Sequence, residues 1–346
     1  MIKRIYFWGF KVVKSTIVIS FGCLVLMLSM TNCVSIAVNT TSEAVPRIAS
    51  KEAGVRVLSW NISGDAFVRE PETFRAFVKK AQANVLLLDE VDPSTTEDQI
   101  RSAIKGTTLN QNDVWYINFG QSGGRQRDVI VSCLPQESLP EFSRIIPYPE
   151  FEKDRIHKRM IEADMTKYTK SLEDGIAVNG VILKDGERRL LVVSMDLECC
   201  GNAPDSWEED KRRIETREIR KIIRQVINRT HIDGIIVAGD FNLVSTGIPL
   251  VNLLGPYKPP HAGLIAAELY HQDGMTTWTW DGRGTPFPSR AMDFVLYSPN
   301  AIKLKEGYIF STEDLSIEEL KKMGVQSESS SKMSEHLPLI AEFVWQ

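Results

Sequence analysis

The chain has 346 residues with a formal net charge of −4, and 43% of the residues are hydrophobic and 25% charged. This composition is typical of a globular protein and excludes a collagen-like, disordered or disulfide-dense chain. Because the charge balance is acidic, non-specific attraction to a polyanion is excluded as the main binding force. A phosphate-ester substrate would need local neutralisation, for which a divalent cation is the obvious candidate.

The first 33 residues have the pattern of an export signal. Lys3, Arg4, Lys11 and Lys14 precede an almost wholly apolar run at 15–30, as in the basic and hydrophobic regions of a secretory leader. The apolar run is slightly shorter than the roughly 20 residues that a membrane-spanning helix needs. We therefore expect an exported protein, periplasmic or at the cell surface, with a retained membrane anchor as the alternative.

Two processing sites are compatible with this leader. Met30–Cys33 resembles a loose bacterial lipoprotein box, in which Cys33 receives the lipid and anchors the protein to a membrane. Asn32 departs from that box, because the position usually holds Gly, Ala or Ser. Alternatively, the small residues Ser35 and Ala37 mark a site of ordinary signal-peptide cleavage.

A polar tether is expected at 34–53, and residues 54–346 form one predicted α/β domain. Short runs rich in Val, Ile and aromatic residues, bounded by Gly, Asp or Pro, predict its strands. Runs that are apolar at every position fit strands buried on both faces. The predicted strands are 55–62, 84–91, 114–120, 128–134, 177–183, 189–197, 234–241, 291–298 and 338–345.

Helical patterns lie between these strands. Pro71 begins one helix, where its missing N–H costs nothing, and an apolar stripe follows at Phe74, Phe77, Val78 and Ala81. A longer helix follows Ser206, with apolar residues at helical spacing between 214 and 227. The strand content predicts two packed sheets with helices outside. The polar, Ser-rich segment 324–335 predicts a mobile surface loop.

Polar residues recur at the ends of the most hydrophobic strands. A carboxylate at the end of a buried strand is costly unless it is paired or bound to a metal. In layered α/β folds, functional sites form where a rigid core holds side chains beside solvent. The sequence therefore predicts a convergent site built from Asn61, Glu90, Asp240, Asn242, Asp293 and His336.

The order of these motifs resembles the endonuclease/exonuclease/phosphatase superfamily, which includes deoxyribonucleases, sphingomyelinases and inositol polyphosphate 5-phosphatases. The motifs are SWN, LLLDEV, GDFN, AMDF and SEHLP, and the resemblance covers residues 55–346. It implies a four-layer α/β/β/α sandwich of two packed mixed β-sheets. It also implies a metal-dependent phosphoesterase.

The resemblance assigns the metal to Glu90, which matches the carboxylate that binds the essential Mg²⁺. Asn61 matches the residue that helps to orient the metal and the phosphate. The assignment is chemically reasonable, because Mg²⁺ prefers oxygen ligands and keeps several waters, so one or two carboxylates suffice to hold it. Mn²⁺ is expected to substitute for it.

The resemblance assigns the chemistry to four further residues. Asp240 matches the group that positions or deprotonates the attacking water, and Asn242 matches the amide that hydrogen-bonds the phosphate. Asp293 and His336 match a pair in which the carboxylate orients the imidazole and favours its charged form. A positioned water and positive charge beside the equatorial oxygens are what hydrolysis of a phosphate ester requires.

The sequence departs from the family pattern in three places. Glu335 replaces the usual Asp before the last histidine. Asp196 stands where many members carry a His that acts at the phosphate, so it is either a second metal ligand or a sign of altered activity. The Gly-rich segment 123–128 is weak, and its Arg125 and Arg127 are either substrate contacts or part of a solvated hairpin.

The sequence therefore predicts an exported, Mg²⁺-dependent phosphodiesterase of nuclease type, acting as a monomer on a phosphate ester such as a nucleic acid or a phospholipid head group. The alternatives are a sphingomyelinase-like or inositol-phosphate phosphoesterase, and a non-catalytic member that keeps the fold as a binding module. Asp196 is the main support for the non-catalytic alternative.

Overall fold

The computed structural model describes residues 54–257 and 261–346. The predicted leader at 1–33, its lipidation residue Cys33 and the tether at 34–53 lie outside the described residues, so these predictions stay predictions. Within the described ranges, no helix is both long and apolar enough to span a bilayer.

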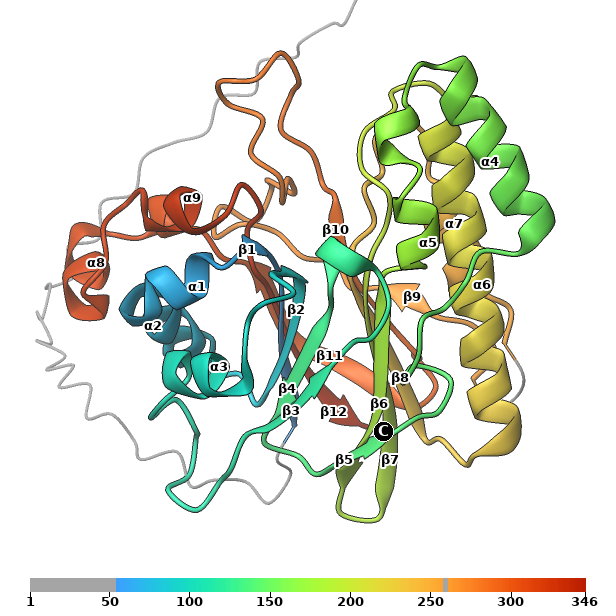
Figure 1. Cartoon of the computed structure of the whole chain (residues 1–346). Helices are drawn as coiled ribbons and strands as arrows, with labels where there is room; N and C mark the ends of the chain where they lie inside the picture. Colours follow the sequence, from blue (N-terminus) through green and yellow to red (C-terminus); the bar gives the residue numbers. More distant parts are fainter. Residues whose placement is uncertain (1–53, 258–260) are drawn as a thin grey trace, which may run out of the picture. The chain divides into compact units, whose positions relative to one another are not determined.

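Two six-stranded sheets form the centre of the fold (Figure 1). The first has the order β11 (Ile302–Ile309), β12 (Leu339–Trp345), β1 (Val55–Gly64), β2 (Val85–Val91), β4 (Val129–Ser132), β3 (Tyr116–Phe119). The second has the order β5 (Gln136–Ser138), β6 (Val178–Asp185), β7 (Arg188–Asp196), β8 (Gly234–Asp240), β10 (Asp293–Tyr297), β9 (Ile265–Ala266). Both sheets are mixed, because β1–β2 and β7–β8 pair in parallel and their other neighbours pair antiparallel.

Helices cover the outer face of each sheet, and Figure 1 shows the two groups on opposite sides of the strands. One hydrophobic cluster joins the first sheet to its helices, a second joins the other sheet to its own, and a third fills the space between the sheets. The first sheet carries α1 (Ala66–Arg69), α2 (Pro71–Ala81), α3 (Glu97–Ala103), α8 (Ile317–Met323) and α9 (Ser329–Met333). The second carries α4 (Glu150–Glu162), α5 (Ser171–Asp174), α6 (Trp207–Arg229) and α7 (Ile248–Leu254). The predicted four-layer α/β/β/α sandwich is confirmed.

The helix patterns of the sequence match the structure. Pro71 is the first residue of α2, and the predicted apolar stripe of that helix is buried against the first sheet. The hydroxyl of Ser206 caps α6 by accepting a hydrogen bond from the Glu209 N–H. The first residues of α2 and α6 are therefore set by local signals.

One sequence prediction is wrong in the structure. The segment 324–335 is not simply a surface loop, because it contains α9 and buries Ser330 and Ser334. The Ser330 hydroxyl accepts from the Thr312 N–H at 2.8 Å, and the Ser334 hydroxyl donates to the Asn61 carbonyl at 2.7 Å. These hydroxyls are polar by composition but make internal hydrogen bonds, which removes the cost of burying them.

Candidate active site

The space between the two sheets changes from apolar to polar along the strands. Side chains alternate between the two faces of a strand, and the inward-facing positions in mid-strand are apolar, as at Val57, Leu87 and Val192. Toward one end of the same strands the inward-facing residues become polar and stay buried. They are Asn61 of β1, Asp89 of β2, Asp196 of β7, Asp240 of β8 and Asp293 of β10.

His336 is held between two carboxylates at this polar end. Its Nδ1 lies 2.9 Å from Asp293 Oδ2, and its Nε2 lies 3.6 Å from Asp240 Oδ2. Asp240 and Asp293 are directly paired across β8 and β10. Asp293 and His336 lie 43 positions apart in the sequence. Strand register and the segment that leads into β12 bring them together.

These carboxylates keep the imidazole charged. Burial alone lowers the pKa of His336, but Asp293 and Asp240 outweigh it and raise the pKa to about 10. Burial raises the pKa of Asp240 to about 7, with the charge of His336 opposing the rise. At neutral pH the site thus holds an imidazolium beside a carboxyl group that can accept a proton.

Asn61 connects Glu90 to this group. Its Nδ2 donates to Glu90 Oε1 at 3.0 Å and to Asp240 Oδ2 at 3.3 Å, while its Oδ1 accepts from the Ser63 N–H at 3.1 Å. Glu90 has a positive φ of 54°, an uncommon backbone state for a residue with a side chain. Strain of this kind persists where the surrounding structure enforces it, which is often a functional site.

Asn242 and Asp196 complete the cluster from the second sheet. Asn242 donates from its backbone N–H to Asp240 Oδ1 at 2.8 Å, and from Nδ2 to the Leu197 carbonyl at 2.8 Å and to Asp196 Oδ1 at 3.4 Å. Asp196 is the register partner of Asp240 across the parallel pair β7–β8. Burial, followed by repulsion from Glu90 and Asp240, raises the pKa of Asp196 well above its usual range.

The Gly-rich segment contributes a different residue from those predicted. Gln126, at the end of the short 3-10 helix Gly124–Gln126, donates from Nε2 to Asp196 Oδ2 at 2.8 Å. The Arg127 guanidinium donates to the carbonyls of Asp92 at 2.7 Å and Thr95 at 3.0 Å, and lies over the Phe119 ring. Arg127 therefore holds a loop, and Arg125 is exposed. Substrate contact by either arginine stays a prediction.

Sequence reasoning missed Thr279. Its hydroxyl donates to Asp293 Oδ2 at 2.5 Å and accepts from the N–H groups of Met292 and Asp293 at 2.9 Å each. Thr279 lies between Trp278 and Trp280, a segment that the sequence marks only by its aromatic residues. A buried threonine between two tryptophans has no local signature of such a role.

The donor set at this site suits a hard divalent cation. Among the described residues, ligand atoms of Asp240, Asp293 and His336 lie within 4.8 Å of one another. A protonated imidazole cannot ligate a metal, so the raised pKa of His336 makes it a poor ligand. Glu90, which is only half-buried and whose carboxylate is oriented by Asn61, is the better carboxylate for a Mg²⁺ that keeps its waters.

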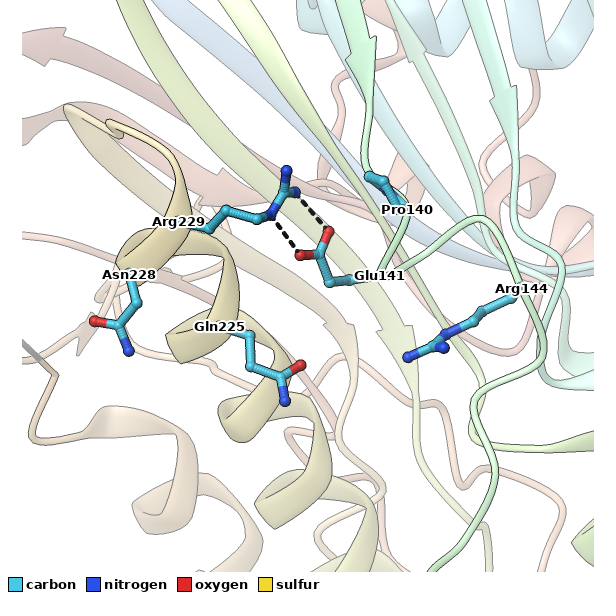
Figure 2. A pocket seen from close by; sticks show the side chains of 6 residues that line it. All are labelled: Pro140, Glu141, Arg144, Gln225, Asn228 and Arg229. Carbon is cyan, nitrogen blue, oxygen red and sulfur yellow. Dashed lines mark hydrogen bonds and ion pairs between the residues drawn. The ribbon is translucent and has the colours of Figure 1, made fainter.

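A hollow of the surface is lined by other residues than those of the candidate active site. It is formed by Pro140, Glu141, Arg144, Gln225, Asn228 and Arg229 (Figure 2). Arg229 and Glu141 form a bidentate ion pair in this hollow. Arg229 Nε donates to Glu141 Oε1 at 2.9 Å, and Arg229 Nη2 donates to Glu141 Oε2 at 2.8 Å. None of the predicted catalytic residues lines this hollow.

Comparison with protein-family models gave one match. A sequence model of the Endonuclease/Exonuclease/phosphatase family matches residues 58–316. No significant match to a curated protein was found.

Several solved structures share the fold at low sequence identity. Truncated TDP2 from Caenorhabditis elegans is 15% identical with a TM-score of 0.54, over 84% of this chain and 98% of that chain. An endonuclease/exonuclease/phosphatase from Bacteroides vulgatus is 13% identical with a TM-score of 0.53, over 85% of this chain and 100% of that chain. The human Nocturnin catalytic domain, with a bound sulfate anion, is 15% identical with a TM-score of 0.51, over 85% of this chain and 94% of that chain. These likenesses concern the fold alone.

Proposed function

This chain belongs to the endonuclease/exonuclease/phosphatase family, whose members are hydrolases acting on phosphoester bonds, and on that premise we propose that it is a divalent-metal-dependent phosphodiesterase of nuclease type. The observation that carries the proposal is the charged His336 ring held between Asp293 and Asp240, with Glu90 linked to Asp240 through Asn61. A scaffold without activity would have no use for this concentration of buried charge.

Each residue has a distinct task in the proposed reaction. His336 holds its proton at Nε2, where it can donate to a phosphoryl oxygen, because Nδ1 is engaged by Asp293. Asp240 accepts the proton of the attacking water, and the Asn242 backbone N–H fixes its Oδ1. A Mg²⁺ bound at Glu90 would neutralise charge that develops on the phosphate. Asn61 donates hydrogen bonds to both carboxylates and so fixes the positions of Glu90 and Asp240 relative to each other.

The Trp278–Trp280 segment lies beside the proposed catalytic group. Trp280 is bridged to Arg290 and to His336, so the segment packs against the site. We place a nucleic-acid phosphodiester first among the candidate substrates, ahead of a phospholipid head group and an inositol phosphate.

A substrate panel with added Mg²⁺ or Mn²⁺ tests the proposal. It contains plasmid DNA, an abasic duplex, RNA, sphingomyelin, inositol phosphates and bis-(p-nitrophenyl) phosphate. We expect cleavage of a nucleic acid that stops with EDTA and falls at least about 100-fold in Glu90→Gln, the loss typical of removing one electrostatic group from a catalytic site. Hydrolysis of sphingomyelin or inositol phosphate alone would replace the nuclease assignment. No hydrolysis of any substrate would favour a binding module.

We propose further that the protein is exported and lipid-anchored at Cys33, and that the mature chain is a monomer. The support is the basic and apolar leader and the Met30–Cys33 sequence. Metabolic labelling with palmitate checks the anchor, since Cys33→Ser should incorporate none. Light scattering on the purified domain checks the monomer.

A further inference from the structure

Two adjacent thiols that the proposed reaction does not use lie in the loop between β7 and α6. Cys199 and Cys200 are both free and exposed. Their Sγ atoms lie 2.9 Å apart and share a hydrogen bond in which either thiol can be the donor. Two sulfurs this close need only a small movement to reach the roughly 2.05 Å of a disulfide bond.

The backbone turns sharply at these cysteines. Cys200 has a φ of 67° and Gly201 a φ of 66°, so two successive residues adopt the left-handed conformation. This conformation is uncommon for a residue with a side chain. Gly201 has no room for one, because a Cβ there would lie 2.5 Å from the Ser206 hydroxyl oxygen. Packing against the start of α6 therefore holds the turn that places the two thiols together.

Arg212 of α6 fixes the loop on both sides of the thiol pair. This arginine is 0% exposed. It donates to the carbonyls of Glu198 at 2.8 Å, Cys200 at 2.7 Å and Gly201 at 3.3 Å. In the part of the chain that the structure describes, no hydrogen bond goes to the peptide group that joins Cys199 to Cys200. The flanks of the pair are held, and the peptide group between the two cysteines can adjust.

The contact between the thiols makes them chemically unequal. With Cys199 as the donor, the hydrogen bond lowers the pKa of the Cys200 thiol and raises that of Cys199. The thiolate is the form that attacks a disulfide, so Cys200 is the nucleophile of the pair. Cys133 is only partly exposed, and burial raises its pKa to about 12. Cys133 is therefore a much less reactive thiol.

We propose that Cys199 and Cys200 form a redox site, which a small disulfide such as oxidised glutathione converts into a reversible disulfide. The Cys200 thiolate attacks one sulfur of the oxidant, breaks its S–S bond and releases one thiolate. That thiolate takes the proton of Cys199. The Cys199 sulfur then attacks the Cys200 sulfur, and the second thiolate leaves and takes up the proton that Cys200 had released. The two cysteines are oxidised and the small disulfide is reduced to two thiols.

The resulting disulfide should be easily reduced. Neighbouring residues joined by a trans peptide have Cα atoms about 3.8 Å apart, below the roughly 4.4 Å at which ordinary disulfides begin. Strain of this kind makes a disulfide more reducible, and strained, exposed disulfides are the labile ones. The loop that this bond closes is the shortest possible, so its entropic stabilisation of the fold is small. The pair is therefore suited to respond to the thiol–disulfide balance around the protein.

Peptide mapping after oxidation tests the proposal. The purified protein is reduced, freed of reductant, treated with oxidised glutathione, alkylated with iodoacetamide and cleaved with trypsin. The tryptic peptide 190–211 contains both cysteines and no other. We expect this peptide to lose two hydrogens and carry no alkyl group, and to become doubly alkylated again after an excess of reduced glutathione. Ring closure should be about 10-fold faster in the folded protein than in concentrated urea, because the fold holds the reacting sulfurs together.

Three variants serve as controls. Cys199→Ser and Cys200→Ser each leave one thiol in the peptide and should stop at the mixed disulfide with glutathione. Cys133→Ser changes a thiol outside the pair and should close the ring at the wild-type rate.

The opposite results are equally clear. A wild-type peptide that retains glutathione, or that stays doubly alkylated after oxidation, overturns the proposal. A disulfide that resists an excess of reduced glutathione overturns its reversibility. Equal rates in the folded protein and in urea would show that the fold does not prepare the pair. None of these measurements depends on the proposed hydrolysis.

Discussion

The Thr279 hydroxyl donates a hydrogen bond to the same Asp293 oxygen that faces His336. Two backbone N–H groups, of Met292 and Asp293, donate in turn to that hydroxyl. Thr279 is 1% exposed, so no solvent replaces these bonds. The hydroxyl therefore sets the direction in which the carboxylate meets the imidazole, which makes Thr279 a positioning residue.

Replacing this hydroxyl should slow the reaction without weakening substrate binding. In Thr279→Val we expect kcat to fall about 10-fold at little change in KM, and the fold to lose about 1–3 kcal/mol because two buried N–H donors lose their acceptor. Thr279→Ser keeps the hydroxyl and should restore both values. Steady-state kinetics and urea unfolding of the two variants check this, and a Val variant with wild-type kcat would refute it.

The role of Asp196 can be tested through the dependence of the reaction rate on Mg²⁺ concentration. Its oxygens accept from Gln126 and Asn242 and lie next to Asp240 in register. We expect Asp196→Asn to lower activity and to raise the Mg²⁺ concentration needed for half-maximal rate, since a carboxylate oxygen is the stronger ligand for a hard cation. If Asp196 instead only repels substrate, the Asp196→Asn and Asp196→His variants should hydrolyse substrate faster than the parent protein does. Identical curves of rate against Mg²⁺ for all three would make Asp196 a bystander.

The charge of His336 predicts a pH dependence of stability. Its folded pKa of about 10 lies above its ordinary value of 6.5. A raised pKa means that the charged ring stabilises the fold fully below pH 6.5, and that this stabilisation is lost as the pH rises through about 10. In metal-free buffer the free energy of unfolding of the wild type should exceed that of His336→Gln at pH 6, and the difference should shrink toward pH 10. A constant difference would contradict the charged ring.

Two neighbouring arginines of α6 should differ in their contribution to stability. Arg212 is 0% exposed and donates to the carbonyls of Glu198 and Cys200 and to Glu209. Breaking a buried pair costs about 3–5 kcal/mol, so Arg212→Met should lower the free energy of unfolding by that amount.

Arg213 supplies the matched control, because it binds the same Glu209 from a partly exposed position. We expect Arg213→Met to cost about 1 kcal/mol or less. Urea unfolding measures both, and equal losses would show that burial of Arg212 does not decide its contribution.

The central strands were predictable because their pattern is local. β2, β7 and β8 are buried on both faces over most of their length, so they contain the continuous apolar runs 85–88, 190–193 and 235–238. The edge strand β11 was not predicted, because Lys303, Lys305 and Glu306 break its hydrophobic pattern and only one of its edges pairs. The Ser-rich segment 324–335 was wrongly predicted to be a surface loop. Its composition does not show that Ser330 and Ser334 form buried hydrogen bonds with residues far away in the sequence.

The sequence by itself determined the layered α/β fold, the family and the set of polar residues at the strand ends, because hydrophobic periodicity and motif order are written in neighbouring residues. Only the tertiary structure decided which polar groups meet. The hydrogen bonds from Thr279 to Asp293 and from Gln126 to Asp196 depend on strand register and on loops far apart in the chain. A register shift of one residue would turn the strand residues Asp196 and Asp293 to the opposite face, so their chemistry is set by packing between the sheets.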